Sequence, residues 1–217
     1  MAFLVQGYYA ILDVKGSSVD LPAALAQAAR LLAAGPCCLQ LRGKDLGPAT
    51  LCALGHAVRP GCERARVPLC INDRLDVALA VGAQAVHLGQ GDLPVAQAVR
   101  ARQAAAWPLA IGVSVHDLAE ARAAEADGAD YLGFGPVFPT KSKADARATG
   151  GLGALAEVTA TARVPVVAIG GIGLDNVAAV AAAGARAAAA IAAVDEAPDP
   201  TVAGRAIAAA FVRTGGS

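Results

Sequence analysis

The sequence has few aromatic residues and no excess of charge of either sign. Only 4% of its 217 residues are aromatic, and 18 basic residues balance 18 acidic ones. Because the basic residues form no run, the chain lacks the electrostatic footprint expected of a protein that binds nucleic acid or a charged membrane surface. We therefore expect no nucleic-acid or membrane partner.

Long apolar runs and a cysteine framework are also missing. Although 56% of the residues are hydrophobic, charged or glycine-containing segments interrupt every apolar run, so no segment is predicted to span a bilayer. No basic segment followed by an apolar core opens the chain, and we expect no signal peptide. The five cysteines include no C-x-x-C pair, which argues against disulfides and a zinc site. Reduced thiols in a cytoplasmic protein are the expected state.

Short β-rich apolar runs alternate with alanine-rich stretches of helical length, which is typical of an α/β fold. Helices are expected over residues 21–34, 117–126 and 175–183, among others. Strands are predicted at residues 8–12, 38–42, 69–72, 85–88, 109–113, 131–135, 166–169 and 187–191.

A weak internal repeat supports a cyclic arrangement of these units. Gly82, Gly128 and Gly184 each begin a Gly-Ala-x sequence that follows an expected helix and precedes a predicted strand. Glycine at such a corner can take the left-handed conformation that ends a helix. No linker divides the chain, so we expect one domain over residues 1–217, a single (β/α)8 TIM barrel. A doubly wound open sheet is the alternative.

In a barrel of this kind, chemistry belongs to the C-terminal strand ends and the loops after them. Gln40, Arg42 and Lys44 alternate at the second of these ends, so their side chains would share one face of an extended segment. Two cations that converge on a barrel mouth call for an anion, although a solvated surface turn is the alternative. Ser114 lies at the fifth strand end, and Asp117 is interpreted as a helix N-cap.

Two acidic residues at adjacent strand ends could hold a hard cation together. Asp73 and Asp92 follow the third and fourth predicted strands, and Mg²⁺ commonly takes one or two carboxylates together with substrate phosphate. Helix capping is the alternative for each carboxylate. His87 and His116 lack a matched third ligand and are interpreted as structural, and His56 is expected to lie in a helix.

A second anion site is expected from a glycine-rich loop, residues 170–173, after the seventh predicted strand. Backbone N–H groups there could approach a phosphate at the start of the following helix, and barrels often build phosphate sites from the loops after strands seven and eight. A tight structural turn would explain the same glycines.

Together these motifs resemble the thiamine-phosphate synthase family, from about Tyr9 to Val194. The motifs that carry the resemblance are Gln40-Leu41-Arg42-x-Lys44, Ile71-Asn72-Asp73, Val86-His87-Leu88-Gly89-Gln90-x-Asp92, Gly112-Val113-Ser114-Val115-His116, Gly133-x-Gly135-Pro136-x-x-Pro139-Thr140-x-Ser142-Lys143 and Ala168-Ile169-Gly170-Gly171-Ile172.

The resemblance implies a transferase that joins a pyrimidine diphosphate and a thiazole phosphate into thiamine phosphate, with release of diphosphate. Mg²⁺ would be held by Asp73 and Asp92. The residues implied for the pyrimidine diphosphate are Gln40, Arg42, Lys44, Asn72, Ser114 and Lys143, of which Arg42, Lys44, Ser114 and Lys143 would be catalytic. Those implied for the thiazole phosphate are Thr140, Ser142, Gly171, Ile191 and Ala192.

The sequence departs from the family pattern at a few positions. Ala192 stands where the family commonly has serine, which removes a possible hydrogen bond to phosphate. Gly43, Lys141 and Arg186 also differ from the usual residues. Two other functions remain open: a thiazole tautomerase of the same barrel family that uses His116 as acid or base, and a phosphate-ligand sensor without turnover.

Overall fold

Eight parallel strands close into a barrel in the computed structural model, which describes residues 4–140 and 150–212. Each strand pairs with the next along the chain, and β8 pairs with β1. The closed ring confirms the (β/α)8 prediction and rules out the open sheet. The strands are β1 (Gly7–Asp13), β2 (Cys38–Arg42), β3 (Leu69–Asn72), β4 (Ala85–Leu88), β5 (Ala110–Val115), β6 (Tyr131–Phe134), β7 (Val166–Ile169) and β8 (Ala187–Ala189).

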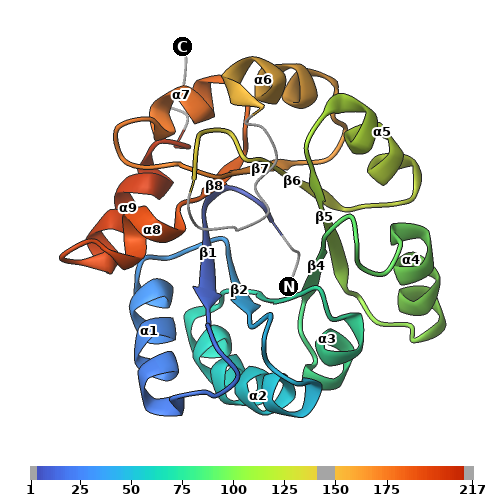
Figure 1. Ribbon diagram of the computed structural model, residues 1–217, viewed down its shortest axis with the longest axis vertical. Helices are drawn as coiled ribbons and strands as arrows, with labels where there is room; N and C mark the ends of the chain where they lie inside the picture. The colour runs from blue at the N-terminus through green and yellow to red at the C-terminus, as the bar shows by residue number, and fades with distance from the viewer. Residues whose placement is uncertain (1–3, 141–149, 213–217) are drawn as a thin grey trace.

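Helices surround this barrel on the outside (Figure 1). Asp20, Asp117 and Asp199 each accept a hydrogen bond from a backbone N–H of the helix that follows, as N-caps do. Asp117 is thereby confirmed as a cap. The described helices are α1 (Leu21–Ala33), α2 (Pro48–Ala65), α3 (Leu75–Val81), α4 (Val95–Ala104), α5 (Leu118–Ala126), α6 (Gly151–Thr161), α7 (Val177–Ala182), α8 (Ile191–Asp195) and α9 (Pro200–Ala209).

The repeated glycine corners adopt the expected conformation. Gly82, Gly128 and Gly184 have φ values of 70°, 96° and 93°, and each lies just after a helix. In this left-handed region a side chain with a Cβ is strained, so glycine ends each helix at low cost.

Two predicted strand ends at the functional end of the barrel, those of β8 and β5, are wrong by two residues, and those of β1 and β6 differ by one. The eighth strand stops at Ala189, and Ile191 begins the short helix α8 instead of ending the strand. The fifth strand extends to Val115 because Ser114 and Val115 still pair with Gly133 and Phe134 of β6. Ser114 therefore lies inside a strand, where the ladder fixes its direction.

The glycine loop after β7 does not open a helix directly, contrary to the sequence prediction. Helix α7 begins at Val177, and the side chain of Asn176 accepts a hydrogen bond from the Gly173 N–H at 2.9 Å. Gly170 and Gly171 have positive φ, and a Cβ at either would lie 2.6 Å from the segment after β6. The glycines are thus required by a tight turn packed against its neighbouring loop.

The strands present different residues to their two faces, because successive side chains in a strand point in opposite directions. One buried cluster lies between the strands and the helices and includes Leu39, Leu41 and Ile71. A smaller cluster fills the barrel interior and includes Tyr9, Cys70 and alanines of β8. Among the described residues, no helix is both long and apolar enough to cross a membrane.

Candidate functional site

A pocket opens at the C-terminal end of the barrel, and every strand contributes to it. Of the site residues predicted from the sequence, Gln40, Arg42, Asn72, Ser114 and Ile191 line this pocket. The complete lining is Tyr9, Ile11, Asp13, Gln40, Arg42, Asn72, His87, Ser114, Tyr131, Gly133, Val167, Ile169, Ala189 and Ile191. Chemistry in (β/α)8 barrels occurs at this end, so we call these residues the mouth pocket.

Arg42 is held in the mouth pocket by a carboxylate that the sequence reasoning missed. Its Nη1 donates to Asp13 Oδ1 at 2.5 Å, across the β1–β2 pair in which the two residues are register partners. The Asp13 side chain is only 6% exposed and that of Arg42 17%. A partly buried guanidinium paired in this way is fixed in direction and retains further N–H donors for an anion. Asp13 directly follows the first predicted strand, which is the signal that could have identified it.

Asp73 and Asp92 lie close together, with two cations nearby. Burial and the Asp92 carboxylate raise the pKa of Asp73 from 3.8 to about 6, and Lys44 and Arg42 act in the opposite direction. The Lys44 ammonium lies 3.9 Å from the Asp73 carboxylate and is mostly exposed, outside the mouth pocket itself. Asp92 Oδ2 accepts the Gly89 N–H at 2.6 Å. The two carboxylates therefore repel each other where a shared cation would relieve the repulsion.

This donor set fits a magnesium ion. The described residues contain no group of three or more His, Cys, Asp or Glu side chains that could hold a metal. A zinc site would need such a group, but Mg²⁺ is commonly bound by one or two carboxylates, water and substrate phosphate. Asp73 is also fixed by its backbone, which has a φ of 63° and donates its N–H to the His87 carbonyl at 2.7 Å.

A chain of polar side chains crosses the barrel below Ser114. Gln40 Nε2 donates to the Tyr9 hydroxyl at 3.0 Å, and that hydroxyl lies 3.0 Å from the hydroxyl of Tyr131. His87 then bridges Tyr131, 3.2 Å from its Nδ1, and Ser114 Oγ, 3.0 Å from its Nε2. Sequence reasoning interpreted His87 as structural and missed both tyrosines.

Glycines on β5 and β6 make room for the rings of that chain. A Cβ at Gly112 would lie 2.0 Å from the Tyr131 ring, and one at Gly133 would lie 2.7 Å from the His87 ring. Real Cβ atoms do not approach so closely, so both positions require glycine for steric reasons. The available signal in the sequence was a glycine two residues before Ser114 on β5 and another two residues after Tyr131 on β6.

The structure describes four of the five residues predicted for the thiazole phosphate, Thr140, Gly171, Ile191 and Ala192. Gly171 packs against Phe138 and Pro139, so the loop after β7 lies beside the segment that leads to Thr140. Ile191 lines the mouth pocket, whereas the next residue, Ala192, is exposed on α8. Ser142 and Lys143 lie outside the described residues.

The other two histidines are placed away from the mouth pocket. His116 is bound to Glu120 of α5, with Nδ1 2.7 Å from the carboxylate. His56 is exposed on α2, as expected for a helical residue.

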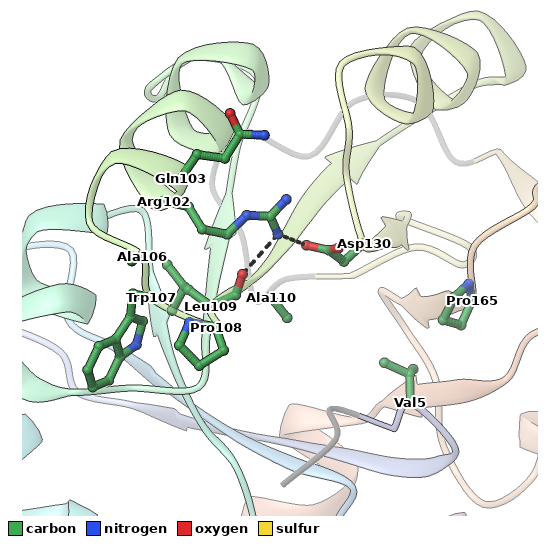
Figure 2. A pocket seen from close by; sticks show the side chains of 10 residues that line it. All are labelled: Val5, Arg102, Gln103, Ala106, Trp107, Pro108, Leu109, Ala110, Asp130 and Pro165. Atoms are coloured by element: carbon green, nitrogen blue, oxygen red, sulfur yellow. Dashed lines mark hydrogen bonds and ion pairs between the residues drawn. The ribbon is translucent and has the colours of Figure 1, made fainter.

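The opposite end of the barrel also has a hollow, of about 730 Å³, which Figure 2 shows. Its charged groups satisfy one another, because Arg102 donates to both the Asp130 carboxylate and the Leu109 carbonyl. The hollow lies at the N-terminal end of the strands, whereas chemistry in (β/α)8 barrels belongs to the C-terminal end, so the mouth pocket is the better candidate.

Comparison with known proteins identifies the family. Residues 9–194 match the family described as thiamine monophosphate synthase, TMP-TENI. The chain belongs to this family. The thiamine-phosphate synthases of Methanoregula boonei and Anaeromyxobacter dehalogenans are 48% and 47% identical to the chain, over 83% and 86% of its length and 82% of their own. Thiamine phosphate pyrophosphorylase from Pyrococcus furiosus has a TM-score of 0.80 at 34% identity, covering 94% of this chain and 95% of that one.

As a member of the thiamine monophosphate synthase family, the chain is an enzyme, a transferase of thiamine biosynthesis. The barrel alone would not show this. A 3-hexulose-6-phosphate synthase shares the fold with a TM-score of 0.70 at only 23% identity, over 94% of this chain and all of that one. Because one fold hosts many reactions, the family membership rests on the sequence motifs.

Proposed function

We propose that the chain condenses a pyrimidine diphosphate with a thiazole phosphate, giving thiamine phosphate and diphosphate. The observation that carries the proposal is the convergence of Gln40, Arg42, Asn72 and Ser114 on one pocket whose rim holds the acid pair Asp73 and Asp92. In this reaction the bond from the pyrimidine methylene carbon to the diphosphate oxygen breaks, and diphosphate leaves with the electron pair. The thiazole nitrogen then supplies the pair for the new carbon–nitrogen bond.

Most of the catalysis in such a substitution is stabilisation of the departing anion. Arg42, aimed by Asp13, and the exposed Lys44 would bind the diphosphate oxygens, with Ser114 and Asn72 as neutral donors. Gln40 would orient the pyrimidine ring from the buried side of the mouth pocket. Lys143, which lies outside the described residues, is proposed as a further cation for the same anion.

Asp73 and Asp92 would hold Mg²⁺ in the same mouth. When bound, Mg²⁺ would neutralise negative charge on the leaving diphosphate. The thiazole phosphate would be received at the rim by Thr140, Ser142, Gly171, Ile191 and Ala192. Holding both substrates against one pocket converts a meeting of two molecules into a step within one complex. We further propose that the enzyme works in the cytoplasm, in keeping with its reduced thiols.

The two alternatives make different demands on the site. A tautomerase that used His116 would need this imidazole at the pocket, but it is bound to Glu120 and is absent from the lining. A sensor would bind both ligands without forming product.

Diphosphate release with both substrates and Mg²⁺ tests the proposal. We expect steady release that requires both substrates and falls by roughly 100-fold in Asp92→Asn. Asp76→Asn, at an exposed acid on α3, is the matched control and should retain full activity. Thermal stabilisation by both substrates with no diphosphate formed would contradict the proposal and favour the sensor.

A further inference from the structure

Tyr131 lies fully buried in the barrel, between Tyr9 and His87, which in turn contact two residues proposed for the substrate, Gln40 and Ser114. Its ring is in tilted contact with Tyr9, at 6.1 Å between centroids, and with His87, at 5.5 Å. Its hydroxyl is within hydrogen-bonding distance of both of those side chains. Tyr131 itself belongs to none of the family motifs quoted from the sequence.

The donors along this chain follow one after another from Gln40. Its Nε2–H group donates to the Tyr9 oxygen at 3.0 Å, so the Tyr9 hydroxyl can give its single hydrogen to the Tyr131 oxygen at 3.0 Å, for which the Cys70 sulfur is a weaker competing acceptor. The hydrogen of Tyr131 can then go to His87 Nδ1 at 3.2 Å, for which the Cys70 sulfur at 3.6 Å is a weaker competitor.

A histidine that accepts at Nδ1 carries its proton on Nε2. His87 Nε2 lies 3.0 Å from Ser114 Oγ and would donate to it. With its oxygen already accepting, Ser114 directs its own hydrogen elsewhere, and its side chain lines the mouth pocket. A hydroxyl that donates into the pocket suits an anionic ligand such as the diphosphate.

We propose that Tyr131 is a positioning residue: it fixes the tautomer of His87 and thereby makes Ser114 a hydrogen-bond donor toward the diphosphate, while it holds Tyr9 and Gln40 in place on the opposite wall. The proposal rests on the proposed function for the identity of the anion. The direction of the chain is a property of the protein without ligands.

The steric surroundings of Tyr131 agree with a fixed position. Gly112 on β5 leaves space for the ring, and any Cβ there would overlap it. A ring confined in this way loses little further conformational entropy when its hydroxyl contacts Tyr9 and His87. The phenol also stays neutral, because burial raises the pKa of Tyr131 well above its ordinary value.

Tyr131→Phe keeps the ring and removes the hydroxyl, and Tyr8→Phe is the matched control. Tyr8 is equally buried but packs on the outside of β1 against Gly204 of α9. We expect Tyr131→Phe to lower kcat/KM for the pyrimidine diphosphate about tenfold, through the loss of one charge-assisted hydrogen bond at Ser114. The KM for the thiazole phosphate should stay unchanged, and Tyr8→Phe should behave as the parent enzyme. Equal losses in the two variants would overturn the proposal.

Combining the variant with Ser114→Ala separates positioning from simple loss of stability. If Tyr131 acts mainly through Ser114, the double variant should be as active as Ser114→Ala alone, within about twofold. Full additivity of the two losses would contradict the proposal.

The decisive readout is the nitrogen NMR spectrum of the substrate-free protein at neutral pH. The chain has only three histidines, so the His87 signals can be assigned with His56→Gln and His116→Gln. We expect His87 as the Nε2–H tautomer in the parent protein and a mixture of tautomers in Tyr131→Phe. His87 protonated on Nδ1 in the parent protein would refute the proposal. Because this measurement needs no substrate, its outcome is distinct from failure to release diphosphate, which would refute the proposed function instead.

Discussion

On β2, Leu39 and Leu41 belong to the layer between the barrel and the helices, whereas Gln40 and Arg42 line the mouth pocket. On β5, Val113 packs outward and Ser114 inward. The outward residues of these strands are apolar. The inward residues at the C-terminal ends of β1 to β5 are polar, whereas those of β6 to β8 are glycine or apolar. Five or six residues of one strand thus serve two different environments.

The two faces differ in how their side chains are stabilised, by apolar burial on the outward face and by hydrogen bonds on the inward face. The outward face stabilises the fold by burial, at about 1.5 to 3 kcal/mol for each large side chain removed from water. The inward polar groups would destabilise it if they lacked hydrogen bonds. No buried side-chain nitrogen or oxygen lacks a partner in the part of the chain that the structure describes. The inner network is therefore tolerated because every buried polar atom in it has a partner.

The largest effect on the inner face is expected from a substitution at Gly112. Gly112→Ala would place a methyl group 2.0 Å from the Tyr131 ring, and we expect a loss of about 3 kcal/mol in the free energy of unfolding. Gly153→Ala, in open space on α6, is the control and should stabilise by up to about 1 kcal/mol. Denaturant unfolding measures both, and equal stability of the two variants would contradict the packing described for the inner face.

The next largest effect is expected for Asp73. Asp73→Asn removes one of two proposed Mg²⁺ ligands and should lower diphosphate release roughly 100-fold. Stability at neutral pH should not fall, because burial and the Asp92 carboxylate disfavour the charged form of Asp73. Activity assays and thermal unfolding on the same preparation check the two outcomes. If Asp73→Asn is as active as the parent enzyme, Asp73 is not a metal ligand.

The acid pair also predicts a pH dependence. Asp73 has a pKa of about 6 in the folded protein and 3.8 ordinarily, so the folded state holds an extra proton between these values. Without metal, this group makes the protein less stable as the pH rises through that window. Metal binding needs the deprotonated carboxylate of Asp73. The affinity of the site for Mn²⁺, used as a probe in place of Mg²⁺, should therefore be roughly tenfold weaker at pH 5 than at pH 7. Titration of the protein with Mn²⁺ at the two pH values measures this difference in affinity, and the difference should be absent in Asp73→Asn.

The smallest expected effect lies at the rim. Ala192→Ser restores a hydroxyl beside the proposed thiazole-phosphate site, and a hydrogen bond to a charged acceptor should lower the KM for that substrate about fivefold or more. The KM for the pyrimidine diphosphate serves as the internal reference and should not change. An unchanged KM for the thiazole phosphate would remove Ala192 from that site.

The sequence predicted the barrel because its strand runs and glycine corners are local signals. It also predicted which strand ends carry polar residues, and the structure brings Gln40, Arg42, Asn72 and Ser114 together as that rule requires. Contacts across the barrel could not be predicted from the sequence, because Tyr9, His87 and Tyr131 come from strands that are distant in sequence. A hydrophobic pattern cannot distinguish an inward tyrosine from an outward one until the register is known.

The predicted end of the eighth strand was wrong for a related reason. Ile191 belongs to an apolar run that continues β8 in sequence, yet the β7–β8 pairing stops at Ala189 and the chain turns into α8. Strand length is set by the partner strand, which local propensity does not record.

Adjacent residues on β5 test the central claim most directly, that the inner face carries the chemistry and the outer face the stability. Ser114→Ala and Val113→Ala should be compared for the free energy of unfolding and for kcat/KM toward the pyrimidine diphosphate. We predict that Val113→Ala loses about 2 kcal/mol of stability with kcat/KM nearly unchanged. Ser114→Ala should lose about tenfold in kcat/KM and at most about 1 kcal/mol of stability. The reverse pattern, or the same pattern for both variants, would contradict the account.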